Sequence, residues 1–147
     1  MELNQVVIVS AKRTPLGKFM GGLSTVPAPR LGAIAIQGAI DAIGLDVSEI
    51  DEVFMGNVLQ AGVGQSPARQ AAIFSGIPDT VPCTTVNKVC SSGMKTIMMA
   101  AQAIALGDAE VVIAGGMESM SLAPHIVRMR AGIKFGGTQM EDVMQKD

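Results

Sequence analysis

The chain has 147 residues, of which 48% are hydrophobic and 16% are charged. Its formal net charge of −2 gives the chain as a whole no electrostatic reason to bind nucleic acid or an anionic membrane. The length suits one domain, and the high apolar content predicts that this domain buries more surface than it could bury alone.

The sequence carries no recognisable targeting or membrane-spanning pattern. Residues 1–5 are polar and the run VVIV is too short for the core of a signal peptide, so we expect a cytoplasmic protein. Polar side chains interrupt the long apolar stretch at 94–106, which argues against a transmembrane helix. Cys83 and Cys90 lack the CxxC pairs and histidine partners of a zinc site, so we expect neither a metal nor a disulfide in a reducing compartment.

Apolar patterning predicts strands that alternate with helices, with Ser66 as a helix cap and Pro67 at the first helical position. The expected elements are strand 6–11, helix 31–43, strand 51–59, a helix from Pro67 that ends at Gly76, strand 81–86, helix 91–106 and strand 109–114. This alternation predicts an α/β fold with a largely parallel sheet and covering helices. After Met117 the pattern dissolves, and only a short helix-like stretch follows at 140–145.

The stretch VNKVCSSGMK, residues 86–95, places Cys90 just before the first turn of an apolar helix. Unpaired N–H groups and the helix dipole at this end favour a thiolate, and the same groups could hold an oxyanion on a thioester carbonyl. Gly93 is costly inside a helix and suggests close approach of the backbone to a ligand. The alternative interpretation is that Cys90 is an inert core residue.

Apolar side chains surround most of helix 91–106, which is unusual for a surface helix. We therefore expect the helix to be buried nearly all round, between this sheet and a second layer that these residues do not encode. The methionines of the helix fit a simpler role as core residues that fill irregular gaps.

Four separated segments resemble the thiolase family, in particular the N-terminal part of the acetyl-CoA acetyltransferases within it. The segments are VVIVSAKRTPLGKFMGGL, GVGQSPARQAA, VNKVCSSGMKTIMMAAQAI and GDAEVVIAGGMESMSLAPH. The last two are specific to the family, and the resemblance covers essentially the whole chain.

The resemblance implies a chemistry for Cys90. Its sulfur would attack an acyl-CoA thioester, expel coenzyme A and hold the acyl group, with the Cys90 N–H as an oxyanion donor. A second acyl-CoA would then attack in a Claisen condensation that yields acetoacetyl-CoA, and thiolysis of a 3-ketoacyl-CoA is the reverse. Coenzyme A thioesters such as acetyl-CoA would be substrates, with no permanently bound cofactor.

The resemblance also implies how the chain is divided into domains. Residues 1–118 would form the thiolase N-terminal α/β domain and residues 119–147 the start of a loop domain, with the C-terminal half absent. In the family that half supplies a Gly-His-Pro histidine, a Cys-x-Gly cysteine and an asparagine, and none of these motifs occurs here. We do not assign His125 as the base, we interpret Cys83 as a packed structural thiol, and we expect the chain alone to be a poor catalyst.

Three basic residues, Arg128, Arg130 and Lys134, are the candidates for contacting the phosphates of coenzyme A, although solvated surface is the simpler interpretation. The family implies a homo-oligomer, either a dimer or a tetramer. A second hypothesis is an inactive fragment or partner subunit that acts by association with a complementary chain. A related ketoacyl synthase is a third, and CSSGM and GGMESMS favour a thiolase over it.

Overall fold

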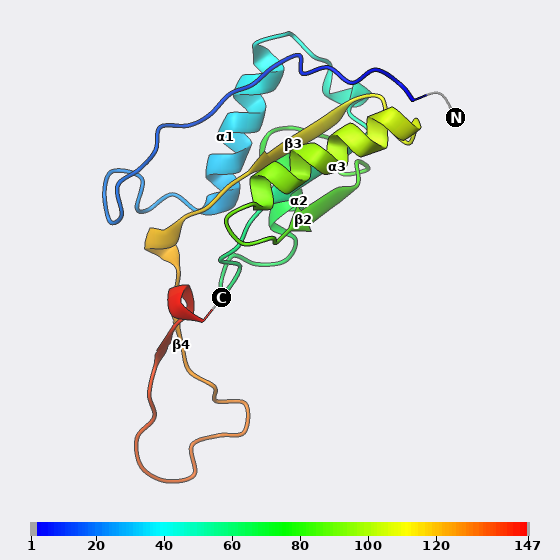
Figure 1. The fold of residues 1–147 in the computed structure, drawn as a ribbon. Coiled ribbons are helices and arrows are strands. Elements are labelled where there is room, and N and C mark those ends of the chain that lie inside the picture. Colours follow the sequence, from blue (N-terminus) through cyan, green and yellow to red (C-terminus); the bar gives the residue numbers. More distant parts are fainter. Residues whose placement is uncertain (1–2, 147) are drawn as a thin grey trace.

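The computed structural model describes residues 3–146, in which three parallel strands form the central sheet in the order β2-β1-β3 (Figure 1). The strands are β1 (Glu52–Gly56), β2 (Cys83–Val86) and β3 (Val112–Gly116). The longer helices are α1 (Ala28–Asp41), α2 (Pro67–Phe74) and α3 (Ser92–Leu106). The predicted α/β fold with a parallel sheet is therefore confirmed.

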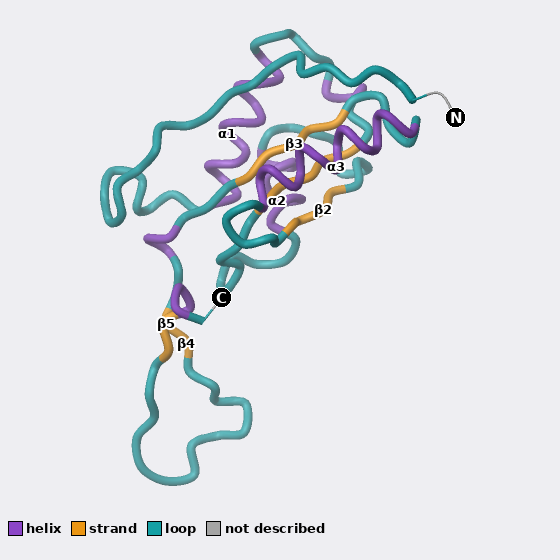
Figure 2. Tube along the Cα trace, in the orientation of Figure 1, coloured by secondary structure: helices purple, strands orange, loops and turns teal. Residues whose placement is uncertain are grey.

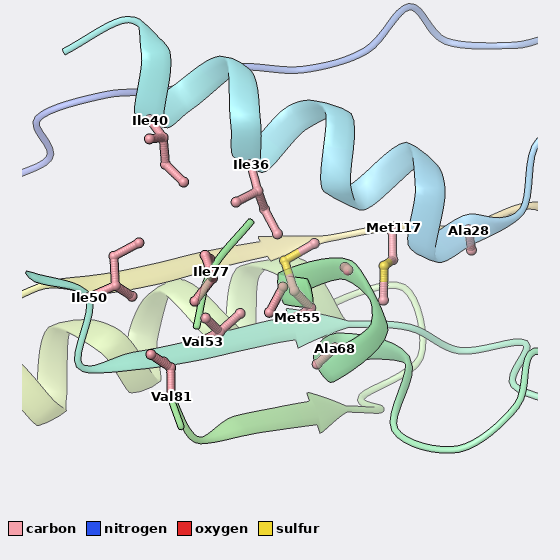
Figure 3. Close-up of a cluster of buried hydrophobic side chains, with 12 residues drawn as sticks. Ala28, Ile36, Ile40, Ile50, Val53, Met55, Ala68, Ile77, Val81 and Met117 are labelled. Atoms are coloured by element: carbon pink, nitrogen blue, oxygen red, sulfur yellow. The ribbon is translucent and has the colours of Figure 1, made fainter. Parts of the chain in front are cut away.

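The two faces of the sheet carry different helices. Val53 and Met55 point from β1 into a core that α1 and α2 cover, as Figure 3 shows. Because side chains alternate along a strand, Gly56 faces the opposite side, where α3 packs on β1 and β3. The buried core cluster consists of Ala28, Ile36, Ile40, Ile50, Val53, Met55, Ala68, Ala71, Ala72, Ile77, Val81 and Met117.

The prediction of a first strand at residues 6–11 is wrong, because the structure describes these residues as an extended loop. No helix or strand is assigned before α1, and the side chains of Val7, Ile8 and Val9 are 64%, 78% and 67% exposed. The segment is held near its start by Asn4, whose backbone N–H donates to the Ala105 carbonyl at 3.0 Å. An apolar run becomes a strand only where a neighbouring strand pairs with it, and none of the described strands does.

The expected cap of α2 is also different from the prediction. Ser66 makes no side-chain capping bond and adopts a left-handed backbone with φ of 47°, while Pro67 does begin the helix. Gly76, with φ of 83°, follows the end of α2 as expected. The helix placed at 31–43 begins three residues earlier, at Ala28, directly after Pro27.

The C-terminal segment forms a separate arm (Figure 2). Strand β4 (His125–Ile126) pairs antiparallel with β5 (Glu141–Asp142), and the chain between them projects away from the sheet. The helix-like stretch at 140–145 is β5 followed by a single 3₁₀ turn, η3 (Val143–Gln145). Two further 3₁₀ turns are η1 (Val47–Glu49) and η2 (Met120–Leu122).

Candidate functional site

Cys90 lies at the edge of the sheet where all three parallel strands end. It follows β2 by four positions and directly precedes Ser91, which occupies the N-cap position of α3 without a side-chain capping bond. The cysteine is exposed. Ligands of open α/β sheets bind outside the carboxyl ends of the strands, so this exposed thiol occupies the place where chemistry is expected.

The first turn of α3 packs unusually closely on the sheet at three glycines. A Cβ added to Gly56 would lie 2.7 Å from the Gly93 nitrogen, and one added to Gly116 would lie 3.2 Å from the Gly93 Cα. A Cβ on Gly93 itself would make an ordinary contact at 3.6 Å. The tight positions are therefore the strand ends, and ligand approach at Gly93 stays a prediction.

Helix α3 buries one face and exposes the other. Ser92, Thr96 and Ala100 are its buried residues, and the Thr96 hydroxyl lies 2.8 Å from the Gly115 carbonyl oxygen of β3. The outer face exposes the apolar side chains of Met94, Ile97, Met98 and Leu106. The expectation that this helix is buried nearly all round is therefore not met within the described residues, and a second layer that covers it stays a prediction.

By length and hydropathy alone, the stretch 89–106 could cross a membrane. Within this stretch, one face of α3 packs against β1 and β3. Packing on the sheet accounts for the buried Ser92, Thr96 and Ala100, whereas the apolar side chains of Met94, Ile97, Met98 and Leu106 stay exposed.

Glu118 joins the ends of β1 and β3, a role that sequence reasoning missed. Its Oε1 accepts hydrogen bonds from Asn57 Nδ2 at 2.8 Å and from the Leu59 N–H at 3.1 Å. Its Oε2 accepts from the Val58 N–H at 3.0 Å, and Asn57 Nδ2 also lies 3.2 Å from the Met117 carbonyl oxygen. The polar Asn57 directly after β1 and the charged Glu118 two positions after β3 were the only signal of this contact in the sequence.

Cys83 has the surroundings of a structural thiol. It is half-buried in β2, packs against the core cluster, and its Sγ donates to the Val81 carbonyl oxygen at 3.3 Å. Burial raises the pKa of the Cys83 thiol, which keeps it protonated. The two cysteines of the chain are therefore in opposite environments.

The remaining candidates lie on the C-terminal arm. His125 is exposed in β4, opposite Asp142. Arg128 Nε lies 3.6 Å from Glu141 Oε2, and Arg130 and Lys134 are exposed in the chain between β4 and β5. No ion pair or hydrogen bond recorded for residues 3–146 joins these four residues to Cys90. Within the same residues, no group of three or more His, Cys, Asp and Glu side chains could hold a metal ion.

Comparison with known proteins gives a consistent result. The thiolase N-terminal domain family model matches residues 6–147. The mitochondrial acetyl-CoA acetyltransferase of Danio rerio is 58% identical over 99% of this chain and 34% of its own length. The proteins of the same name from Bos taurus and Homo sapiens are 55% and 54% identical over the same shares. The chain spans about a third of the length of these relatives.

The same relatives correct one expectation. A cytoplasmic location was predicted from the sequence, and it is contradicted because these relatives are named as mitochondrial proteins. The prediction rested on the absence of a signal-peptide pattern at residues 1–9, and that criterion does not test for mitochondrial targeting, which uses amphipathic segments rich in arginine and serine.

Proposed function

Because the chain belongs to the thiolase family, we propose that it is the nucleophile-bearing N-terminal part of an acetyl-CoA acetyltransferase. The observation that supports this proposal is the exposed Cys90 thiol at the start of α3, beside the carboxyl ends of β1, β2 and β3. The substrates are acetyl-CoA and related coenzyme A thioesters.

In the first half-reaction, Cys90 Sγ attacks the thioester carbonyl carbon. The bond from that carbon to the coenzyme A sulfur breaks, coenzyme A leaves as the thiol after taking up the proton lost by Cys90, and the acyl group stays on Cys90. The Cys90 N–H is the oxyanion donor that we assign. The neighbouring N–H groups of Ser91 and Ser92 already donate to the carbonyls of Lys88 and Val89, at 3.2 and 3.1 Å.

The second half-reaction needs groups that the described residues do not bring to Cys90. A second acyl-CoA loses a proton from the carbon beside its carbonyl, and that carbon attacks the acyl group on Cys90. General acid and base groups typically contribute about 10² to 10⁴-fold to such proton transfers. The 147-residue chain is therefore expected to perform acyl transfer slowly and condensation poorly.

The test is an intact mass measurement of the purified chain after incubation with acetyl-CoA, followed by peptide mapping. One acetyl group on Cys90 is the expected result. Cys90→Ala should abolish the adduct, whereas Cys83→Ala, the matched control, should retain it because Cys83 is half-buried and protonated. Acetylation that persists in Cys90→Ala, or a folded chain with no adduct, contradicts the proposal.

A second candidate function follows from the outer face of α3. Met94, Ile97 and Met98 are exposed there, which suits a chain that acts by association with a complementary polypeptide. Size-exclusion chromatography with light scattering tests this function. A monodisperse monomer that does not bind a polypeptide corresponding to the C-terminal two thirds of a relative would contradict this function. An oligomer that forms through another surface than the outer face of α3 would also contradict it.

A further inference from the structure

The turn between β2 and α3 has one residue in a conformation that its side chain disfavours. Val89 adopts φ of 49°, in the left-handed region. This region is rare for residues other than glycine and is most unfavourable for β-branched side chains such as valine. Val89 directly precedes Cys90, so the geometry of this residue sets the direction in which the thiol leaves the backbone.

Two side chains hold Val89 in this conformation from opposite ends. Asn87 Oδ1 accepts the Val89 N–H at 3.0 Å. Ser92 Oγ donates to the Val89 carbonyl oxygen at 2.6 Å and accepts the Lys88 N–H at 2.8 Å. A strained residue persists only where its surroundings determine its conformation from several sides, and these bonds supply that determination.

Ser92 also connects the turn to the sheet. Its side chain is 4% exposed, and a Cβ added to Gly56, the last residue of β1, would lie 2.8 Å from the Ser92 Cβ. Ser92 therefore packs closely against the end of β1. The Ser92 hydroxyl thus links the turn to the end of β1, alongside the backbone hydrogen bonds that the Ser91 and Ser92 N–H groups make to the Lys88 and Val89 carbonyls.

We propose that Ser92 is a positioning residue for acyl transfer: its hydroxyl holds Val89 in the left-handed conformation and thereby directs Cys90 Sγ toward the thioester. The inference rests on the proposed function, in which Cys90 is the nucleophile. Without the hydroxyl, Val89 relaxes toward negative φ and the peptide that joins it to Cys90 rotates. A small misplacement of a nucleophile is enough to slow a reaction that depends on near-attack geometry.

The test compares Ser92→Ala, Val89→Gly and the double variant in the full chain. The readouts are the rate of Cys90 acetylation by acetyl-CoA and the rate of Cys90 alkylation by iodoacetamide, both measured by peptide mapping. Ser92→Ala should lower the acetylation rate about ten- to a hundredfold and also lower the alkylation rate. Val89→Gly should restore both rates in the double variant, since glycine adopts positive φ without a steric penalty.

Two controls separate positioning from general damage. Ser91→Ala removes a neighbouring hydroxyl that makes no capping bond and should leave both rates unchanged. Cys83 alkylation reports unfolding, because this half-buried thiol becomes accessible when the sheet opens. If Ser92→Ala unfolds, Ser92→Thr, which keeps the hydroxyl, should retain the turn and most of the wild-type rates.

The outcomes are distinct. Wild-type rates in Ser92→Ala, failure of Val89→Gly to restore them, or loss of both rates in a folded Ser92→Thr would overturn the proposal. Absence of acetylation in the wild-type chain would instead refute the proposed function, and the iodoacetamide rates would still decide whether Ser92 holds the turn.

Discussion

Asn57 donates from Nδ2 to Oε1 of Glu118 at 2.8 Å, and this bond ties the residue after β1 to the second residue after β3. Asn57 is fully buried, and the same carboxylate accepts two backbone N–H groups from residues 58 and 59. The loops that follow two of the three strands are therefore held by one side chain. This contact stabilises the edge of the sheet beside which Cys90 lies.

Glu118→Gln tests the contact directly. Glutamine has one acceptor oxygen in place of two, so at least one N–H group at the end of β1 loses its partner. We expect the free energy of unfolding to fall by about 1 to 3 kcal/mol, the usual cost of an unsatisfied buried group. Urea denaturation followed by circular dichroism measures it. The matched control is Glu49→Gln on the exposed turn η1, and an equal loss in both variants would contradict the assignment.

Gly56→Ala tests the close packing of α3 on β1. The new methyl group would lie 2.7 Å from the Gly93 nitrogen, where backbone atoms must move, so we expect a loss of about 1 to 3 kcal/mol. Gly22→Ala is the control, because nothing lies within 4 Å of a Cβ at Gly22, and its effect should stay within about 0.5 kcal/mol. Thermal unfolding of the two variants side by side decides the point. A tolerated Gly56→Ala would mean that α3 is not seated as described.

The hydrogen bonds of the Asp51 carboxylate lead us to predict that the protein loses stability in acid. Hydrogen bonds from the N–H groups of Val111 and Glu110 lower the pKa of the Asp51 carboxyl. The folded state thus favours the carboxylate: its stabilisation is complete above the ordinary aspartate pKa of about 4 and is lost as the pH falls through the lowered value. Urea midpoints of the wild type should fall over this range. Asp51→Asn should be less stable at neutral pH, and its urea midpoint should change less with pH than that of the wild type. If the midpoints of both proteins fall equally steeply in acid, Asp51 is not the cause of the loss.

The two cysteines should differ in reactivity toward iodoacetamide at pH 8. Cys90 is exposed, whereas burial raises the pKa of Cys83 and its thiol stays protonated. We expect Cys90 to be labelled several-fold faster, because the thiolate is the reactive form and must be accessible. Peptide mapping over a time course gives both rates. In urea the two rates should converge, and a difference that survives unfolding would show that the fold is not its cause.

Local patterns in the sequence were sufficient to predict the elements whose formation depends on a few adjacent residues. The alternation of apolar strands and helices, the start of α2 at Pro67 and the glycine that follows α2 were all predicted, because each depends on a few adjacent residues. The place of Cys90 before an apolar helix was also readable. The thiolase resemblance came from motifs, and residues 6–147 match that family.

Contacts between distant residues were decided only by the tertiary structure. Asn57 and Glu118 are 61 positions apart, and neither shows in the sequence that the ends of β1 and β3 are neighbours. The run at 6–11 has the composition of a strand but no strand partner among the described residues, since pairing depends on what lies alongside. Val89 adopts a left-handed conformation against the preference of its own side chain, because its N–H donates to Asn87 Oδ1 and its carbonyl accepts from Ser92 Oγ, and these bonds outweigh that preference.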